Sequence, residues 1–198
     1  MAFFNIHEIV DLVVITLALG FIFKDFFVQA SPSRFKEVDP VAYWRGIKKA
    51  GGDGFKTAIM IAGPAVILHE MGHKVVAISL GFSAEFNAAY FWLGLAILLK
   101  LMNFGFVFFV PAYVSIIGSM TPMQSAIIAF AGPGVNLILW LSAKGLLRNK
   151  RFMKKYKHYR AVLAMTAKIN MFLFIFNMLP IPMFDGFQVY SGLWHALF

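Results

Sequence analysis

Five consecutive residues, His69-Glu70-Met71-Gly72-His73, form an HExxH pattern. Residues four apart on a helix lie on the same face, so both imidazoles can bind one Zn²⁺ at about 2.0–2.1 Å. Glu70 projects beside them, where its carboxylate can take a proton from a zinc-bound water and pass it to a leaving amine. Gly72 leaves space on that side of the helix for a substrate backbone. The pattern therefore indicates zinc-dependent hydrolysis of a peptide bond.

A third metal ligand must come from elsewhere in the chain, because a catalytic zinc normally has three protein ligands and a water. The chain contains no cysteine, which leaves carboxylates and histidines. Most of these lie at chain ends or in polar stretches. Asp185 differs, because it follows the proline-broken end of an apolar segment, where coordination or capping of the terminal helix are its two natural roles. We predict Asp185 as the third ligand, with Glu85 as the alternative.

The composition places this chemistry in a membrane. Hydrophobic residues make up 60% of the 198 residues and charged residues 14%, against roughly 45–50% and about 25% in soluble domains. A soluble core of this size could not bury so much apolar surface, and a disordered chain would not carry it. The formal charge of +9 indicates contact with anionic lipid head groups rather than with nucleic acid.

Apolar segments of about 20 residues predict the membrane-spanning elements. We expect spans at about 9–23, 57–80, 122–147 and 161–179, and a short terminal helix at about 186–198. A kink is expected at Gly63-Pro64, and AGPGVN at 131–136 is turn-like. The polar stretch 31–56 is interpreted as a loop plus an interfacial helix.

The segment between the second and third of these spans fits no simple helix. Residues 88–101 are apolar but short for a crossing, and residues 104–117 are rich in Val, Phe and Ile, which favours strands or a re-entrant hairpin. One more helix at about 88–107 is the alternative. The expected fold class is an all-α integral membrane bundle of about five to six transmembrane helices, with a short membrane-associated β-hairpin or re-entrant segment near 104–117.

Three motifs together resemble the site-2 protease family of intramembrane zinc metalloproteases. They are HEMGH at 69–73, AGPGVN at 131–136 and NMLPIPMFDG at 177–186, in the family's order and on separate spans. The resemblance covers roughly the last two-thirds of the chain and is to a short form without a PDZ or nucleotide-sensing domain. Phe184 stands where the family usually has Leu, and neither the first span nor the 31–56 stretch matches a family feature.

The resemblance implies a role for each motif residue. His69, His73 and Asp185 would bind Zn²⁺, and Glu70 would be the general base. Asn136 and Asn177 would lie near the site and hold the substrate backbone or the oxyanion, although hydrogen bonding between helices is the alternative for both. The 104–117 segment would correspond to the family's β-hairpin, which offers an edge to a substrate strand.

The expected function is hydrolysis of peptide bonds in or near the transmembrane segments of single-span membrane proteins. Residues 1–198 would form one membrane-embedded metalloprotease domain, with a first span and polar loop at 1–56 and a catalytic core at 57–198, in a multi-pass protein of the cell membrane. Two alternatives remain: a catalytically silent member that binds membrane proteins, and a metal-ion transporter that uses the same ligands. Intact Glu70 argues against the first, and the lack of further polar residues that would form a path argues against the second. Orientation stays open, because the positive-inside rule and the family arrangement disagree about the basic stretches.

Overall fold

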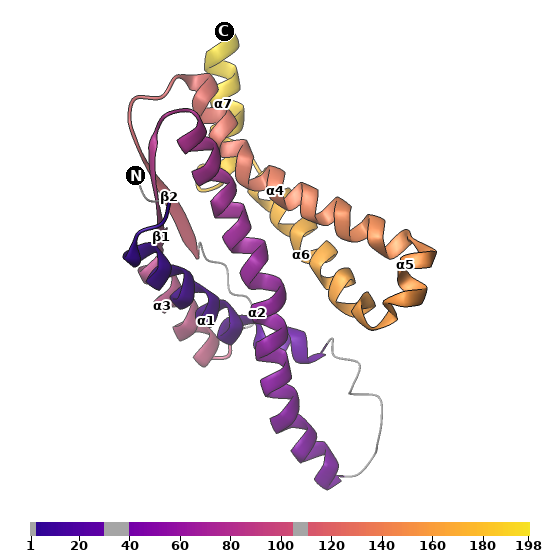
Figure 1. Ribbon diagram of the computed structural model, residues 1–198. Coiled ribbons are helices and arrows are strands. Elements are labelled where there is room, and N and C mark those ends of the chain that lie inside the picture. Colours follow the sequence, from indigo (N-terminus) through magenta and orange to yellow (C-terminus); the bar gives the residue numbers. More distant parts are fainter. Residues whose placement is uncertain (1–2, 30–39, 105–110) are drawn as a thin grey trace.

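The computed structural model describes residues 3–29, 40–104 and 111–198, which are mostly helical (Figure 1). Its elements follow one another along the chain as α1 (Ile6–Gln29), α2 (Pro40–Ser79), β1 (Ser83–Ala88), α3 (Tyr90–Leu101), β2 (Ala112–Ile117), α4 (Pro122–Arg148), α5 (Lys150–Lys155), η2 (Lys157–Tyr159), α6 (Arg160–Asn177) and α7 (Asp185–Leu197).

In the described residues, three helical segments are long and apolar enough to cross a membrane. They are Ile6–Phe27, Pro122–Arg148 and Lys157–Asn177. Helix α3 is apolar but short, and α2, which carries the HExxH pattern, is not among the three. The predicted first, third and fourth spans are thus present as helices, and the total of five to six crossings is not confirmed.

Two helices pass through segments where the sequence predicted a separate element or a turn. Helix α2 runs from Pro40 through Pro64 to Ser79, so residues 40–56, in which a loop plus an interfacial helix was expected, are helical and continuous with the 57–80 span, while 31–39 lie outside the described residues. Helix α4 likewise passes through Pro133 and the whole AGPGVN motif. A proline removes one helical hydrogen bond, but burial of Gly132, Pro133 and Asn136 against neighbouring helices supports the segment.

A two-stranded antiparallel sheet replaces the hairpin that was expected within 104–117. Strand β2 confirms the predicted extended segment, but its partner is β1, which precedes α3, with Ser83 opposite Ile117 and Ala88 opposite Ala112. Residues 105–110 of the predicted hairpin lie outside the described residues. Helix α3 lies between the two strands along the chain. The alternative helix at 88–107 is therefore present in part, as Tyr90–Leu101.

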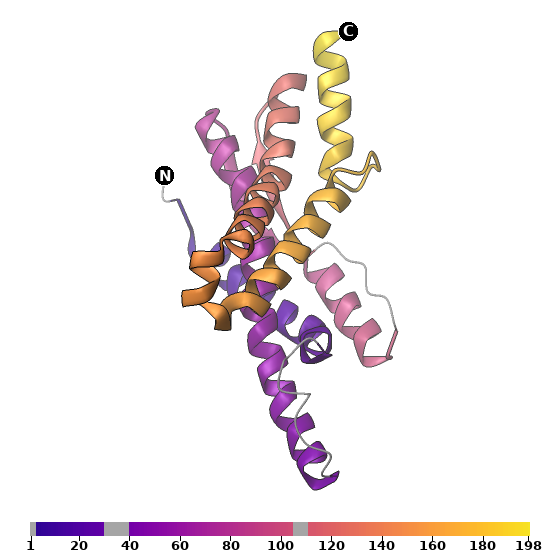
Figure 2. The ribbon, with the colours of Figure 1, turned by 90° about the vertical axis from the view of Figure 1, so that its right-hand side faces the viewer.

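Helix α4 is the central element, in contact with α2, α6 and α7 (Figures 1 and 2). Helix α1 packs along α2 on the other side, and the sheet lies against both. The outer faces of these helices are apolar, whereas several polar side chains are buried inside. Exposed hydrophobic side chains include Ile9 and Val13 of α1, Ile138 and Leu141 of α4 and Phe172 of α6, and buried polar ones include His69, His73, Lys74, Asn136 and Asn170. This inverted pattern suits a lipid environment.

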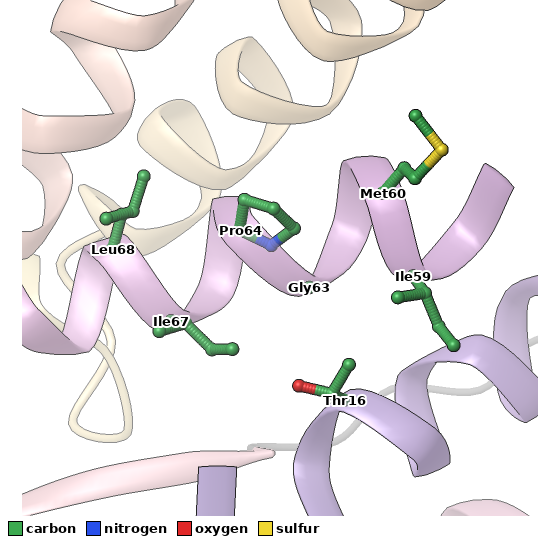
Figure 3. Close-up of a pocket in the computed structure, with 7 residues that line it drawn as sticks. All are labelled: Thr16, Ile59, Met60, Gly63, Pro64, Ile67 and Leu68. Carbon is green, nitrogen blue, oxygen red and sulfur yellow. The ribbon is translucent and has the colours of Figure 1, made fainter. Parts of the chain in front are cut away.

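An apolar groove of about 550 Å³ follows α2 beside α1, along the residues that directly precede the HExxH pattern (Figure 3). Thr16 of α1 faces the groove from one side, and Gly63 and Pro64 form part of the α2 wall. The full lining is Thr16, Ile59, Met60, Gly63, Pro64, Ile67 and Leu68. None of the predicted metal ligands lines it, so this groove is separate from the site described next.

Candidate metal centre

Two distant parts of the chain bring three metal-binding side chains together. His69 and His73 lie one turn apart near the end of α2, and Asp185 is the first residue of α7. One donor atom from each lies within 4.8 Å of the others, and within the described residues this is the one group of three or more His, Asp or Glu side chains close enough to hold a metal ion. Glu85, the alternative third ligand, is exposed on β1 and outside this group.

The donor atoms lie near the spacing of a tetrahedral zinc site, with each histidine closest to a different oxygen of Asp185. His69 Nε2 is 3.1 Å from Asp185 Oδ2, His73 Nε2 is 3.5 Å from Asp185 Oδ1, and the two Nε2 atoms are 3.2 Å apart. Ligand atoms bonded at about 2.0–2.1 Å to a tetrahedral zinc are about 3.3 Å from one another. Two imidazoles and one carboxylate are also a donor set that zinc uses when a fourth position stays open. The residues present therefore fit a catalytic zinc ion.

Hydrogen bonds on the opposite ring nitrogens turn both Nε2 atoms toward Asp185. His73 Nδ1 lies 2.7 Å from the backbone oxygen of Ile128, which can only accept, so Nδ1 carries the proton. His69 Nδ1 lies 2.6 Å from Asn136 Oδ1. The Asn136 amide donates through Nδ2 to the Ala65 carbonyl at 3.0 Å, which fixes Oδ1 as the acceptor. In the neutral form, both rings therefore carry their proton on Nδ1, and Nε2 is the nitrogen available to a metal.

A glycine leaves the space in which an ion would lie. A Cβ placed on Gly132 would collide with His73 Nε2 and lie 2.7 Å from His69 Nε2. Gly72 has a related role in packing, since a Cβ there would be 2.7 Å from the Ala131 carbonyl oxygen. The two glycines let the helices approach closely while a small volume beside the imidazoles stays clear.

Glu70 is buried next to the three candidate ligands. Its side chain is 7% exposed and interacts electrostatically with His69, His73 and Asp185. The Asp185 side chain is 23% exposed, compared with 8% and 9% for the two histidines. The cluster is therefore closed on the α2 side and reachable from the side of Asp185.

The two predicted asparagines occupy different positions. Asn136 is fully buried, and its amide is saturated, because Nδ2 also donates to Asn170 Oδ1 at 2.9 Å. In this arrangement Asn136 supports His69 and has no donor left for a substrate. Asn177 is the partly buried last residue of α6, and its side chain forms no hydrogen bond with the described residues.

Sequence reasoning found only part of the network that holds the histidines, since it placed Asn136 near the site or between helices but did not identify its partners. Asn170 is 1% exposed and continues the network by donating to the Thr166 carbonyl at 2.8 Å. An asparagine inside an apolar span is expected to face the bundle interior, but the residue type does not identify its partner. The Ile128 acceptor is a backbone carbonyl, which no residue type reveals.

An HExxH helix whose histidines meet a carboxylate from another element is the arrangement of zinc-dependent peptidases. The sequence profile of Peptidase family M50 matches residues 144–198, which include Asp185. A protein of Methanocaldococcus jannaschii that carries the name "Putative zinc metalloprotease" is 32% identical over 189 residues, which are 94% of this chain and 84% of that protein. A protein of Synechocystis sp. with the same descriptive name is 29% identical over 142 residues, 71% of this chain and 32% of that protein. No solved structure shows a significant match. The chain belongs to peptidase family M50, the site-2 protease family of zinc metalloproteases.

Proposed function

We propose that this protein is an intramembrane zinc metalloprotease that cleaves peptide bonds in or near the transmembrane segments of single-span membrane proteins. The observation that carries the proposal is the convergence of His69, His73 and Asp185. The two Nε2 atoms lie 3.2 Å apart, and each lies 3.1–3.5 Å from one oxygen of the Asp185 carboxylate, near the spacing of a zinc site. Glu70 supplies the acid–base group that a hydrolase needs and a passive metal site does not.

Each side chain has a definite part in the proposed reaction. His69, His73 and Asp185 would hold zinc, which supplies Lewis acidity that makes water a nucleophile near neutral pH. Glu70 takes the proton of the attacking water and delivers it to the leaving amine. Asn136 and the Ile128 carbonyl keep the two imidazoles oriented. Asn177 remains the candidate for an amide that binds the substrate backbone or the oxyanion.

The position of the cluster supports cleavage below the membrane surface. His73 and His69 precede the end of α2 at Ser79 by six and ten residues, which is about 9 and 15 Å along a helix axis. Exposed apolar side chains flank them on the same helix, among them Leu68 and Val75. We therefore place this part of α2 in the membrane, although it is less apolar than the three segments above. Water would reach the site from the more exposed Asp185 side.

The sheet provides an edge on which a helical substrate could bind after it becomes extended. Peptide bonds inside a helix are internally hydrogen-bonded and sterically covered, so a substrate must become extended before attack. Strand β2 has no strand partner on its outer edge within the described residues. An extended substrate segment could add there by backbone hydrogen bonds, as in β-strand addition elsewhere.

The proposal is tested by reconstituting the protein in liposomes together with a candidate single-span substrate. Wild type should cleave it, and Glu70→Gln should bind zinc normally but lose about 10²–10⁴-fold in rate, since it loses the general base. Zinc content measured on the same preparations controls for damage to the site. Equal cleavage by Glu70→Gln would contradict the assigned mechanism. Zinc uptake into the vesicles without cleavage would favour a transporter instead.

A further inference from the structure

The outer edge of β1 is closed by two carboxylates from the first turns of α1. Phe86 N–H donates to Glu8 Oε1 at 2.7 Å, and Ala88 N–H donates to Asp11 Oδ2 at 2.9 Å. Residues two apart on a strand direct their amides to the same edge. Both carboxylates are buried, so the edge that β1 does not share with β2 cannot accept another strand.

The carboxylate of Glu8 also connects this strand to the helix that carries the metal ligands. Its Oε1 atom forms an ion pair with Lys74, the residue that follows His73. Lys74 is 2% exposed, and its Nζ lies 4.8 Å from the ring centroid of Phe4. Glu8 Oε2 accepts from Asn5 N–H at 2.9 Å, which fixes the Glu8 side chain at the start of α1. One carboxylate thus bridges α1, β1 and the His73 turn of α2.

The sheet and the metal site also share a packing support. Ile128 packs with Ala84 of β1 and Ile116 of β2, and the Ile128 carbonyl accepts the hydrogen bond from His73. Met71, between the two histidines, packs against the cluster that contains Phe86 and Val114. A shift of the sheet would therefore disturb the residues that also support the two imidazoles.

We propose that Glu8, Asp11 and Lys74 are positioning residues of the protease. They fix β1 on α2, and β2 through β1, so that a substrate segment on the edge of β2 opposite β1 lies in a constant register with the metal site. This inference rests on the proposed function. Its physical basis is that a buried charge is costly unless it is paired and hydrogen-bonded, so the bridge resists displacement of any one of its three elements.

The test compares two disrupting variants with a matched control on the same helix. Asp11→Ala removes one edge acceptor, and Glu8→Ala/Lys74→Met removes the other together with the cation, so that no buried charge is left unpaired. Asp25→Ala/Lys100→Met removes a second ion pair of α1, 2.7 Å long, in which Asp25 is 64% exposed. Glu8→Gln/Lys74→Met is the conservative rescue, because the Gln carbonyl can still accept from Phe86 N–H.

Three readouts separate positioning from general stability: zinc content, hydrogen exchange of peptide 83–88, and kcat and KM of the zinc-loaded protein on a single-span substrate. Both disrupting variants should keep zinc, exchange the Phe86 or Ala88 amide about tenfold faster, and raise KM several-fold with a smaller change in kcat. The rescue variant should recover most of the protection and of KM. The control should match wild type.

Two results would overturn the inference. In the first, both disrupting variants have the same amide exchange rates in peptide 83–88 and the same KM as the control. The other is loss of zinc and of protection in α2 and α4 together with the sheet, which would make the three residues general stabilisers. If Glu8→Ala/Lys74→Met does not fold, Asp11→Ala decides, since it breaks no ion pair. If wild type cleaves no substrate, the proposed function fails, and hydrogen exchange alone decides whether these residues fix the sheet.

Discussion

Single residues at the metal centre are held by hydrogen bonds on the ring nitrogens that face away from Asp185. The HExxH spacing predicted His69 and His73 as ligands, and the proline-broken segment before Asp185 pointed to the third; the structure brings the three side chains together. Asn136 was predicted near the site or in hydrogen bonds between helices, but its bond to His69, 67 residues away along the chain, was not, and the acceptor behind His73 is a backbone carbonyl that no residue type reveals. A sequence shows which residue types can bind a metal, whereas the contacts that orient those residues depend on how the helices pack.

Replacement of Asn136 should weaken zinc binding. Asn136→Ala removes the acceptor for His69 Nδ1, so the ring loses its fixed tautomer and orientation, and zinc affinity should fall about 10–100-fold. Competition with a zinc chelator measures this directly. Asn177→Ala is the control, because Asn177 does not contact either histidine through a hydrogen bond, and it should leave zinc affinity unchanged. Unaltered affinity in Asn136→Ala would assign this amide a role other than support of His69.

A methyl group beside the imidazoles should have a similar effect for a steric reason. The Cβ of Gly132→Ala would occupy the space next to both Nε2 atoms, so we expect loss of zinc binding in a protein that still folds. Gly134→Ala, in the same motif, is the matched control, since its Cβ would lie at an ordinary 3.4 Å from the Phe130 ring. Metal analysis of both purified variants provides the comparison. Normal zinc content in Gly132→Ala would show that the site relaxes around the added group.

Among the secondary-structure elements, length and apolarity predicted α4, α6 and α7 to within a few residues. Strand β1 was missed because its sequence, SAEFNA, lacks the β-branched residues typical of strands. Its alternation of Ala84, Phe86 and Ala88 with polar residues does match the burial pattern and could have indicated a strand. The polar stretch 31–56 predicted a loop plus an interfacial helix that was separate from the 57–80 span. Residues 40–56 instead form one helix with that span, because polarity alone does not end a helix outside the membrane.

Close contact between α2 and α4 gives a prediction for the pair of helices. Gly72→Ala would place a Cβ 2.7 Å from the Ala131 carbonyl oxygen, so the helices must separate, at a cost of about 1–3 kcal/mol in unfolding free energy. Gly63→Ala, on the same helix, would meet only Thr16 Cγ2 at 3.8 Å and should be neutral or slightly stabilising. Thermal unfolding in detergent compares them. Equal midpoints would mean that the backbones are further apart than described.

At the scale of the whole molecule, apolar side chains cover the outside of the helices and polar ones lie within the bundle. Composition alone predicted a membrane protein, and the arrangement of exposed and buried residues agrees with that reading. The number of crossings could not be predicted, because short apolar segments such as α3 and polar ones such as α2 do not follow the length rule.

Labelling with a membrane-impermeant thiol reagent should locate the two ends of α4. The chain has no cysteine, so Ser119→Cys and Lys150→Cys each introduce a single thiol at an exposed position beyond one end of this 27-residue helix. If α4 crosses the bilayer, the two thiols should react from opposite sides of sealed vesicles. Reaction of both from the same side would contradict a crossing. The side on which Lys150→Cys reacts would also settle the orientation left open by the basic stretches.

Dependence of β1 on Glu8 and Asp11 has a practical consequence for shortened versions of the protein. The three signature motifs begin at residue 69, so a chain shortened by motif alone would lose α1, with Glu8 and Asp11, as dispensable. Such a fragment would retain every ligand and the general base, yet Lys74 would be left as a buried cation without its counter-ion and two strand amides without acceptors. An inactive truncation of this kind would therefore say nothing about the chemistry of the zinc site.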